Sequence, residues 1–207
     1  VLCRSEMSTQ VVAKRKADDR VGNVVRYDGR LRVIEYIHWP EVVRERAAGG
    51  DPAQFWAGSI GVHAFDLGFL QRMAADGDVL PFHVSEKKQV NYVNASGELV
   101  EPKEPNALKF ERFIFDLMPR AENAVVMEVD ARTHFAPLKN AADKEEDTPE
   151  TVRAQMAAVH AKWLRQAGAQ VADGVPVEIS PLFALDAAEV AEKIPPGTQI
   201  SMPRYFD

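Results

Sequence analysis

The sequence predicts an α/β fold: a mixed β-sheet with flanking helices and two β-hairpins. Two observations lead to this class. Segments with strand patterning alternate with segments of helical spacing along the 207 residues, an order typical of helices packed on a sheet. Two pairs of neighbouring strands are joined by short turns, which allow only antiparallel pairing. Because no internal repeat, long linker or low-complexity tract is present, we predict a single domain over residues 1–207.

The first part of the chain supplies most of the predicted strands. They cover residues 9–13, 21–27, 31–36 and 56–65. Asp28-Gly29 joins the second strand to the third, because the turns of two-residue hairpins need positive φ angles. A helix is predicted at residues 40–48, where Gly49-Gly50 ends it. Asp66 can cap a further helix, whose apolar positions are Leu67, Leu70 and Met73.

A second hairpin is predicted at residues 90–100, with Ser96-Gly97 as its turn. Pro102 and Pro105 then mark a loop. Helical spacing follows it, and is carried by Phe110, Phe113, Ile114 and Leu117. Residues 123–129 form the next strand candidate.

The clearest local signal is a helix start at Thr148-Pro149-Glu150. It combines a hydroxyl cap, a proline at the first helical position and a carboxylate in the first turn. Gly168 ends this helix. Its predicted buried face consists of Val152, Met156, Val159 and Trp163. A last strand is predicted at residues 177–183, followed by a short helix at residues 186–193 before Pro195-Pro196-Gly197.

The composition is that of an ordinary globular protein, with 46% hydrophobic and 27% charged residues. A net charge of −6 and a pI of about 5.5 argue against a nucleic-acid surface, although a pocket for a small phosphorylated substrate needs only a few cations. No apolar run approaches the roughly 20 residues of a membrane span, and no export signal is visible. Cys3 is the one cysteine, which excludes an internal disulfide. We therefore expect a cytoplasmic protein without nucleic-acid or membrane partners.

Spacing alone identifies no catalytic site. The five histidines, at positions 38, 63, 83, 134 and 160, lack zinc-ligand spacing, so no metal site is predicted from the residues present. Neither a Gly-x-Ser-x-Gly elbow nor a Walker loop occurs. Composition and spacing therefore leave the chain at the level of a soluble α/β domain.

Four longer motifs carry more information. The strings VGNVVRYDGRLRVIEY, KEPNALKFERFIFD, FAPLKNAADKEEDTPETVRA and VEISPLFAL occur in this order and at fitting distances. Together they resemble the C-terminal half of the UDP-N-acetylhexosamine (UDP-N-acetylglucosamine) pyrophosphorylase group, within the wider UDP-sugar pyrophosphorylase family. The resemblance extends over about residues 8–183, and PLKNA…DTPET is its most specific part.

The resemblance implies a Rossmann-like, GT-A-like nucleotidyltransferase sheet, of which this chain would be the C-terminal portion. It also implies a reaction in which UMP is transferred from UTP to a hexose 1-phosphate and pyrophosphate is released. Magnesium would be needed, because two anions must meet and charge develops on the leaving group. The aspartate that binds this metal belongs to the other half of the family's domain.

Two lysines match positions that the family places near phosphate. Lys139, in Pro-Leu-Lys-Asn, is the expected catalytic residue and nucleotide-phosphate contact. Asn140-Ala141-Ala142 separates it from the acidic run that follows. Lys109, in Asn-Ala-Leu-Lys-Phe-Glu, matches a second phosphate-binding lysine, and a lysine on a helix surface is the alternative interpretation.

The sugar side of the site is carried by further matches. Glu35-Tyr36 ends a strand and matches a pair whose carboxylate accepts hydrogen bonds from sugar hydroxyls, beyond the carboxyl end of a strand. Gly22 matches a glycine that lets the backbone approach the sugar. Ser59 stands where the eukaryotic pattern has an asparagine that contacts the sugar. This departure leaves N-acetylglucosamine, N-acetylgalactosamine, glucose and other hexoses open.

Phe113 and Phe115 match two aromatic residues that line the family's sugar pocket. Positions two apart on a helix differ by about 200° of rotation. Both rings can therefore line one pocket only if this segment is extended or is just entering its helix. Otherwise one of them belongs to the core.

The family's Gly-rich nucleotide loop, of the Leu-x-Gly-Gly-x-Gly-Thr-Arg type, has no match here, and the first residue is Val1. We therefore expect a piece of a longer chain that is inactive by itself. Two alternatives remain: a truncated relative that acts as a non-catalytic binding module, and a UDP-glucose pyrophosphorylase. The open edge of a half sheet makes self-association of the fragment a further expectation.

Overall fold

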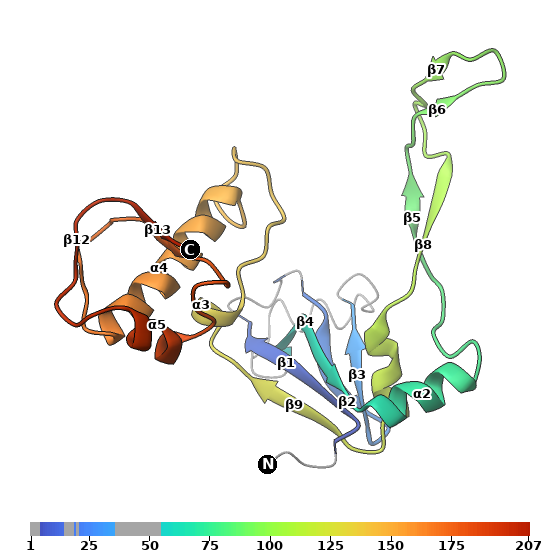
Figure 1. Cartoon of the computed structure of the whole chain (residues 1–207). Helices are drawn as coiled ribbons and strands as arrows, with labels where there is room; N and C mark the ends of the chain where they lie inside the picture. Colours follow the sequence, from blue (N-terminus) through green and yellow to red (C-terminus); the bar gives the residue numbers. More distant parts are fainter. Residues whose placement is uncertain (1–4, 15–18, 20, 36–54) are drawn as a thin grey trace. The chain divides into compact units, whose positions relative to one another are not determined.

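The computed structural model describes residues 5–14, 19, 21–35 and 55–207 of the chain. The chain divides into two compact units, Val1–Glu128 and Val129–Asp207 (Figure 1), and each unit is described by itself. That the two units belong to one catalytic domain stays a prediction. The helix predicted at residues 40–48 and its glycine stop lie outside the described residues, as does Cys3.

Unit 1 contains a five-stranded sheet in the order β3-β2-β4-β1-β9. Its strands are β1 (Met7–Ala13), β2 (Asn23–Tyr27), β3 (Arg30–Ile34), β4 (Ala57–Phe65) and β9 (Ala124–Glu128). β9 runs parallel to β1, whereas the β1–β4, β2–β4 and β2–β3 pairs are antiparallel. The predicted mixed sheet is therefore confirmed. The predicted hairpin turn is also present, with φ angles of 49° at Asp28 and 71° at Gly29.

The core of unit 1 forms between the sheet and two helical segments. These segments are α2 (Leu67–Ala75) and the 3-10 helix η3 (Ile114–Arg120). Met7 and Val11 of β1 pack together with Phe69 of α2 and with Leu117 and Met118 of η3, and all five side chains are buried. Alternation along β1 brings Met7 and Val11 to the same face, as expected for a strand with one face on the core.

β4 carries a bulge opposite β1. Thr9 pairs with His63 and Val11 pairs with Ser59, so four steps along β4 face two steps along β1. Gly61 lies inside this bulge with a φ angle of 73°, a conformation that favours glycine. The bulge explains why a strand of this sheet is rich in glycine.

Glu6 ties the beginning of β1 to two other parts of unit 1. Its carboxylate accepts hydrogen bonds from the backbone N–H of Glu122 at 2.8 Å and from the guanidinium of Arg72, in α2, at 2.5 Å. The Glu122 N–H, followed by Arg72, holds the pKa of Glu6 below its ordinary value of 4.5. The backbone N–H of Glu6 donates to the side chain of Asn123, at the start of β9.

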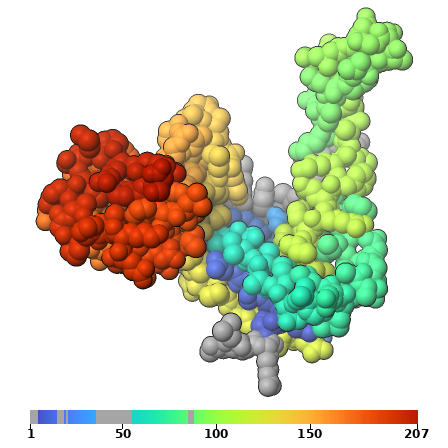
Figure 2. All heavy atoms as spheres, viewed as in Figure 1, coloured from blue at the N-terminus to red at the C-terminus, as the bar shows by residue number. Residues whose placement is uncertain are grey.

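Residues 83–111 form a two-stranded arm. It consists of two antiparallel strand pairs. One pairs β5 (His83–Lys88) with β8 (Ala107–Glu111), and the other pairs β6 (Tyr92–Val93) with β7 (Leu99–Val100). Figure 1 shows β6 and β7 at the tip, and Figure 2 shows the arm as a narrow column of green atoms. The tip turns where the Gly97 N–H donates to the Asn94 carbonyl at 3.0 Å. The hairpin predicted at residues 90–100 is confirmed as this tip.

The helical spacing predicted from Phe110 onward is partly wrong. Phe110 lies in β8, where it pairs with Val84 of β5, and helical structure begins only at Ile114. Cross-strand pairing along the arm outweighs the local periodicity here, as tertiary context commonly does. The loop predicted around Pro102 and Pro105 lies between β7 and β8.

Unit 2 combines helices with short parallel strand pairs. Its helices are α3 (Ala131–His134), α4 (Pro149–Gln166) and α5 (Ala187–Lys193), and its strands are β10 (Gln170–Val171), β11 (Val177–Ile179), β12 (Gln199–Ile200) and β13 (Arg204–Phe206). β10 pairs with β12 and β11 pairs with β13. Both pairs are parallel, so β12 and β13 run beside β10 and β11 in the same direction. Leu164, Val177, Val190 and Phe206 join the core between the helices and these strands.

Helix α4 begins as the sequence predicts. Thr148 is the N-cap, Pro149 stands at the first helical position, and Gly168 follows the end with a φ angle of 87°. The predicted buried face is wrong in part, because Ala161 and Leu164 are buried while the side chain of Met156 is 49% exposed. Small alanine side chains let the helix approach the strands closely, and a pattern search for large apolar residues misses them.

Of two further predictions for unit 2, one is wrong in its extent and the other is confirmed. The strand predicted at residues 177–183 ends at Ile179, because Ser180 begins a turn in which it accepts the N–H groups of Phe183 and Ala184. The predicted last helix is confirmed as α5, capped by the Asp186 carboxylate at 2.9 Å from the Glu189 N–H. β10, β12 and β13 were not predicted, because strands of two or three residues are too short to show an alternation of apolar and polar residues.

Replacing Thr148 by Ala should lower the free energy of unfolding of unit 2 by about 1 kcal/mol. Thr148 is 2% exposed, and its hydroxyl accepts the Thr151 N–H while its own N–H donates to the Thr151 hydroxyl at 2.9 Å. Urea unfolding followed by circular dichroism measures the change. Ser201→Ala, at an exposed position, is the control. Equal midpoints for the two variants would show that the cap does not stabilise α4.

Candidate functional site

A hollow of about 280 Å³ lies beside the end of β3 in unit 1. The residues that line it are Tyr27, Arg32, Val33, Ile34, Glu35, His83 and Phe115. They come from the β2–β3 hairpin, from the base of the arm and from the beginning of η3. The hollow therefore lies where three elements that are distant in the sequence meet.

Gly22 and Glu35 approach each other closely at this hollow. A Cβ atom built on Gly22 would lie 2.7 Å from Oε1 of Glu35 and 2.7 Å from Cγ1 of Val33. Such distances are far shorter than a van der Waals contact between carbon or oxygen atoms. The absence of a side chain at position 22 therefore makes room for the Glu35 carboxylate.

Ser59 joins the same group through the backbone. Its N–H donates to the carbonyl of Gly22 at 2.8 Å. The neighbouring Asn23, only 1% exposed, fixes this corner, because its amide donates to the Val21 carbonyl at 3.1 Å and accepts from the Lys14 ammonium at 3.3 Å. The structure thus brings together Gly22, Glu35 and Ser59, which the sequence singled out separately. Tyr36, the fourth member of the predicted group, lies outside the described residues.

Phe113 and Phe115 form an aromatic stack with a centroid distance of 4.8 Å and an interplanar angle of 9°. The stack is possible because Phe113 is extended, with φ −113° and ψ 127°, and the 3-10 helix begins at the next residue. This is the condition under which both rings could serve one pocket. Phe115 lines the hollow, and Phe113 packs behind it.

The His63 ring makes an edge contact with Phe115, with a centroid distance of 6.5 Å and an interplanar angle of 60°. Burial lowers the pKa of His63 below its ordinary value of 6.5. Among the residues that the structure describes, its Nδ1 atom and the hydroxyl of Thr9, its partner across the strands, are buried without a hydrogen bond. The aromatic wall of the hollow is therefore backed by a polar pair in the sheet.

Lys109 lies in β8 of the arm, where its ammonium forms an ion pair with the carboxylate of Glu111. It is on a strand and not on a helix surface, and it does not line the hollow. Its expected contact with phosphate stays a prediction.

Lys139 lies in unit 2, in a loop that folds back on itself. The backbone N–H groups of Lys139 and Asn140 both donate to the carbonyl of Asp147 at 3.0 Å, and the Asn140 amide donates to the Glu146 carbonyl at 2.8 Å. Asp147 has a φ angle of 56° and directly precedes the N-cap of α4. The capped helix therefore holds both ends of the loop that presents Lys139.

Five residues of the hollow were not expected from the sequence: the apolar Val33 and Ile34, and also Tyr27, Arg32 and His83. The Arg32 guanidinium lies 5.5 Å from the centroid of the Tyr27 ring. Both residues belong to the first of the four motifs, so a closer reading of that motif could have found them. His83 gives no such signal, because it reaches the hollow only through the pairing of the arm.

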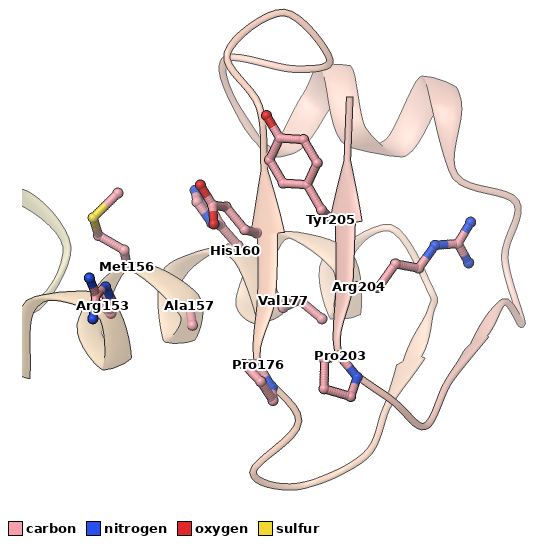
Figure 3. A pocket seen from close by; sticks show the side chains of 10 residues that line it. Arg153, Met156, Ala157, His160, Pro176, Val177, Pro203, Arg204 and Tyr205 are labelled. Atoms are coloured by element: carbon pink, nitrogen blue, oxygen red, sulfur yellow. The ribbon is translucent and has the colours of Figure 1, made fainter. Parts of the chain in front are cut away.

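A second hollow, of about 580 Å³, lies in unit 2 between α4 and the β11–β13 pair (Figure 3). Its lining includes Arg153, Met156, His160 and Tyr205. His160 connects the helix to the open edge of β11, because its Nδ1 atom accepts the Ile179 N–H at 3.3 Å. Figure 3 shows Arg204 pointing away from His160, and its guanidinium packs 4.7 Å from the centroid of the Phe206 ring. None of the site residues expected from the sequence lines this hollow.

The described part of the chain contains no group of three histidine, cysteine, aspartate or glutamate side chains with the geometry of a metal site. The expected magnesium therefore has no assigned ligands among these residues. The described helices include none that is both long enough and apolar enough to span a membrane.

Comparison with known proteins identifies the family to which this chain is similar. The UTP–glucose-1-phosphate uridylyltransferase family matches residues 3–185. UDP-N-acetylhexosamine pyrophosphorylase-like protein 1 from Homo sapiens is 37% identical over 84% of this chain and 34% of its own length. UDP-N-acetylglucosamine pyrophosphorylase from Saccharomyces cerevisiae is 35% identical over 84% of this chain and 37% of its own length.

Solved structures agree with these matches. A structure from Entamoeba histolytica, described as a UDP-N-acetylglucosamine pyrophosphorylase, is 27% identical and has a TM-score of 0.79. The match covers 99% of this chain and 50% of that chain. The chain belongs to the UTP–glucose-1-phosphate uridylyltransferase family, and the relatives named here are UDP-N-acetylhexosamine and UDP-N-acetylglucosamine pyrophosphorylases. It spans little more than a third of the length of these two relatives.

The stability of unit 2 should fall as the pH drops below about 6.5, because burial lowers the pKa of His160. A hydrogen bond with the Val177 backbone and the charge of Glu178 oppose this shift without reversing it. The unfolded chain therefore binds the proton first, and the stabilising contribution is complete above pH 6.5 and is lost as the pH falls through the lower, folded pKa.

Urea midpoints between pH 7.5 and pH 5 measure this effect in a background in which Trp39 and Trp56 are replaced by Phe. Emission then comes from Trp163, whose ring lies 5.6 Å from that of His160. In His160→Gln the dependence on pH should be smaller than in the wild type. His134→Gln, at an exposed position in α3, is the control. An unchanged slope in His160→Gln would show that this histidine does not couple folding to pH.

Proposed function

We propose that this chain is the sugar-binding part of a uridylyltransferase that transfers UMP from UTP to N-acetylhexosamine 1-phosphate. The single observation that carries the proposal is the group formed by Gly22, Glu35 and Ser59 beside a hollow whose wall is Phe115. A carboxylate at the rim and an aromatic face in the wall are the two chemical features that recognise a hexose, since its hydroxyl groups project from the rim of the ring and its C–H groups form apolar faces.

In the proposed reaction an oxygen of the sugar phosphate attacks the α-phosphorus of UTP, the bond between that phosphorus and the bridging oxygen breaks, and pyrophosphate leaves. Lys139 would contribute a positive charge to the phosphates, which lowers the cost of bringing two anions together. Glu35 and Tyr36 would orient the sugar. Magnesium is part of the proposal as a neutraliser of the developing negative charge on pyrophosphate.

N-acetylhexosamine is the preferred sugar because the similar proteins named above carry N-acetylhexosamine or N-acetylglucosamine in their names. Glucose is the second candidate, because Ser59 replaces the asparagine of the eukaryotic pattern and the matching family is named for glucose 1-phosphate. A Rossmann-like, GT-A-like character of the sheet, a cytoplasmic location and self-association of the chain belong to the same proposal.

The proposed sugar site can be tested by binding. In Gly22→Ala the added Cβ would lie 2.7 Å from the Glu35 carboxylate and displace it, so the affinity for N-acetylglucosamine 1-phosphate should fall at least about tenfold. Gly68→Ala, in α2 and outside the lining of the hollow, is the matched control. Titration calorimetry measures both variants. Unchanged affinity in Gly22→Ala would contradict the assignment of this corner to the sugar.

The proposed role of Lys139 can be tested by turnover. The 207-residue chain with UTP, magnesium and N-acetylglucosamine 1-phosphate should release no pyrophosphate, because it lacks the family's Gly-rich loop. When the family's missing half is supplied, activity should return. Lys139→Ala should then reduce kcat by about a hundredfold or more, and Lys162→Ala, an exposed lysine of α4, should not. Turnover by the chain alone, or full activity of Lys139→Ala, would refute these assignments.

A further inference from the structure

We propose that His83 and Asp116 form a positioning pair that holds the Phe113–Phe115 stack against the hollow of unit 1. By fixing the stack, the pair would determine how strongly the hollow selects a sugar with an added apolar group. The inference rests on the proposed function of this hollow and extends it to His83, which lies outside the four motifs, and to Asp116, which ends the second of them.

The first step is the contact between the two side chains. Nε2 of His83 lies 2.6 Å from Oδ2 of Asp116, and the two side chains are only 26% and 18% exposed. A carboxylate that accepts from an imidazole N–H at this distance makes a charge-assisted hydrogen bond, which is among the stronger side-chain contacts. Its partial burial protects it from competition by water.

The second step leads from this contact to the wall of the hollow. The His83 ring packs on Phe113 with a centroid distance of 4.9 Å, and Phe113 stacks on Phe115 at 4.8 Å. Phe115 also makes an edge contact with the ring of His63, in β4, at a centroid distance of 6.5 Å. The four rings are therefore connected by three successive contacts, from the base of the arm to the sheet. The hollow is lined by two of them, His83 and Phe115.

The third step is the backbone that carries the stack. Phe113 is extended and Ile114 begins η3, and no side chain caps the start of this helix. If this 3-10 helix began one turn earlier, the positions of the two rings would differ by about 240° of rotation, and the rings could not stack. Asp116 acts at this junction twice: its N–H donates to the Phe113 carbonyl at 3.0 Å, and its carboxylate holds the His83 ring. The pair therefore fixes the point at which the strand becomes a helix.

The arm has a second, separate anchor at its base. The Arg112 guanidinium lies 3.9 Å from the centroid of the Phe82 ring and 2.7 Å from the Asp78 carboxylate. Neither contact involves the row of rings. Arg112 therefore offers a matched control: its removal loosens the base of the arm but leaves the His83–Asp116 pair intact.

The test compares two ligands that differ by one acetamido group, N-acetylglucosamine 1-phosphate and glucose 1-phosphate. Their affinities for the 207-residue chain are measured by NMR titration. A pocket wall typically distinguishes one small apolar group by roughly 10- to 200-fold. In Asp116→Ala and His83→Gln the ratio of the two affinities should fall about tenfold, because the displaced wall no longer contacts the acetyl methyl group. Asp116→Asn keeps an acceptor for the imidazole and should retain most of the ratio, and Arg112→Ala should retain all of it.

The outcomes separate the inference from the function on which it rests. An unchanged ratio in Asp116→Ala, or an equal loss in Arg112→Ala, would overturn the positioning role while leaving the sugar site in place. A general loss of structure would weaken both ligands alike and leave the ratio unchanged, which also counts against the inference. If the wild-type chain binds neither ligand, the proposed function of the hollow is wrong and the positioning role falls with it.

Discussion

The close approach of Gly22 to Glu35 is the constraint on which the candidate site depends. The Glu35 carboxylate can lie against the backbone just before β2 only because no Cβ intervenes, since a Cβ at position 22 would come within 2.7 Å of it. The carbonyl of the same glycine accepts the N–H of Ser59, so one residue connects the β2–β3 hairpin to β4. A substitution here would disturb both the carboxylate and the strand that carries Ser59.

A second constraint is the change from strand to helix after Phe113. The arm and the hollow share this junction, because β8 ends at Glu111 and η3 begins at Ile114. Because Phe113 is extended and the helix begins at the next residue, the rings of Phe113 and Phe115 stack, whereas in a helix they would point in different directions. In unit 2 the position of Lys139 likewise depends on a helix start, because hydrogen bonds to Asp147 close its loop next to the N-cap of α4. Both predicted contact regions thus depend on how a helix begins.

Local chemistry explains which features could be predicted from the sequence. The Asp28-Gly29 turn, the cap at Thr148 and the stop at Gly168 follow from short-range rules on φ angles and hydrogen bonds, and the structure contains each of them. β8 was missed, because its partners in β5 lie 19 to 28 positions away in the sequence. For the same reason His83 could not be predicted at the hollow. Gly22, Glu35 and Ser59 were identified by motif, but their mutual contact appears only in the folded sheet.

The measurement that tests the central claim most directly is a map of backbone amide shifts in the 207-residue chain during titration with N-acetylglucosamine 1-phosphate. The account predicts the largest shifts at Gly22, Glu35, Ser59 and Phe115, around the hollow of unit 1. It predicts none beside Tyr205 and His160, which line the hollow of unit 2. Shifts confined to the hollow of unit 2, or saturation without any shift at Gly22 and Ser59, would contradict it.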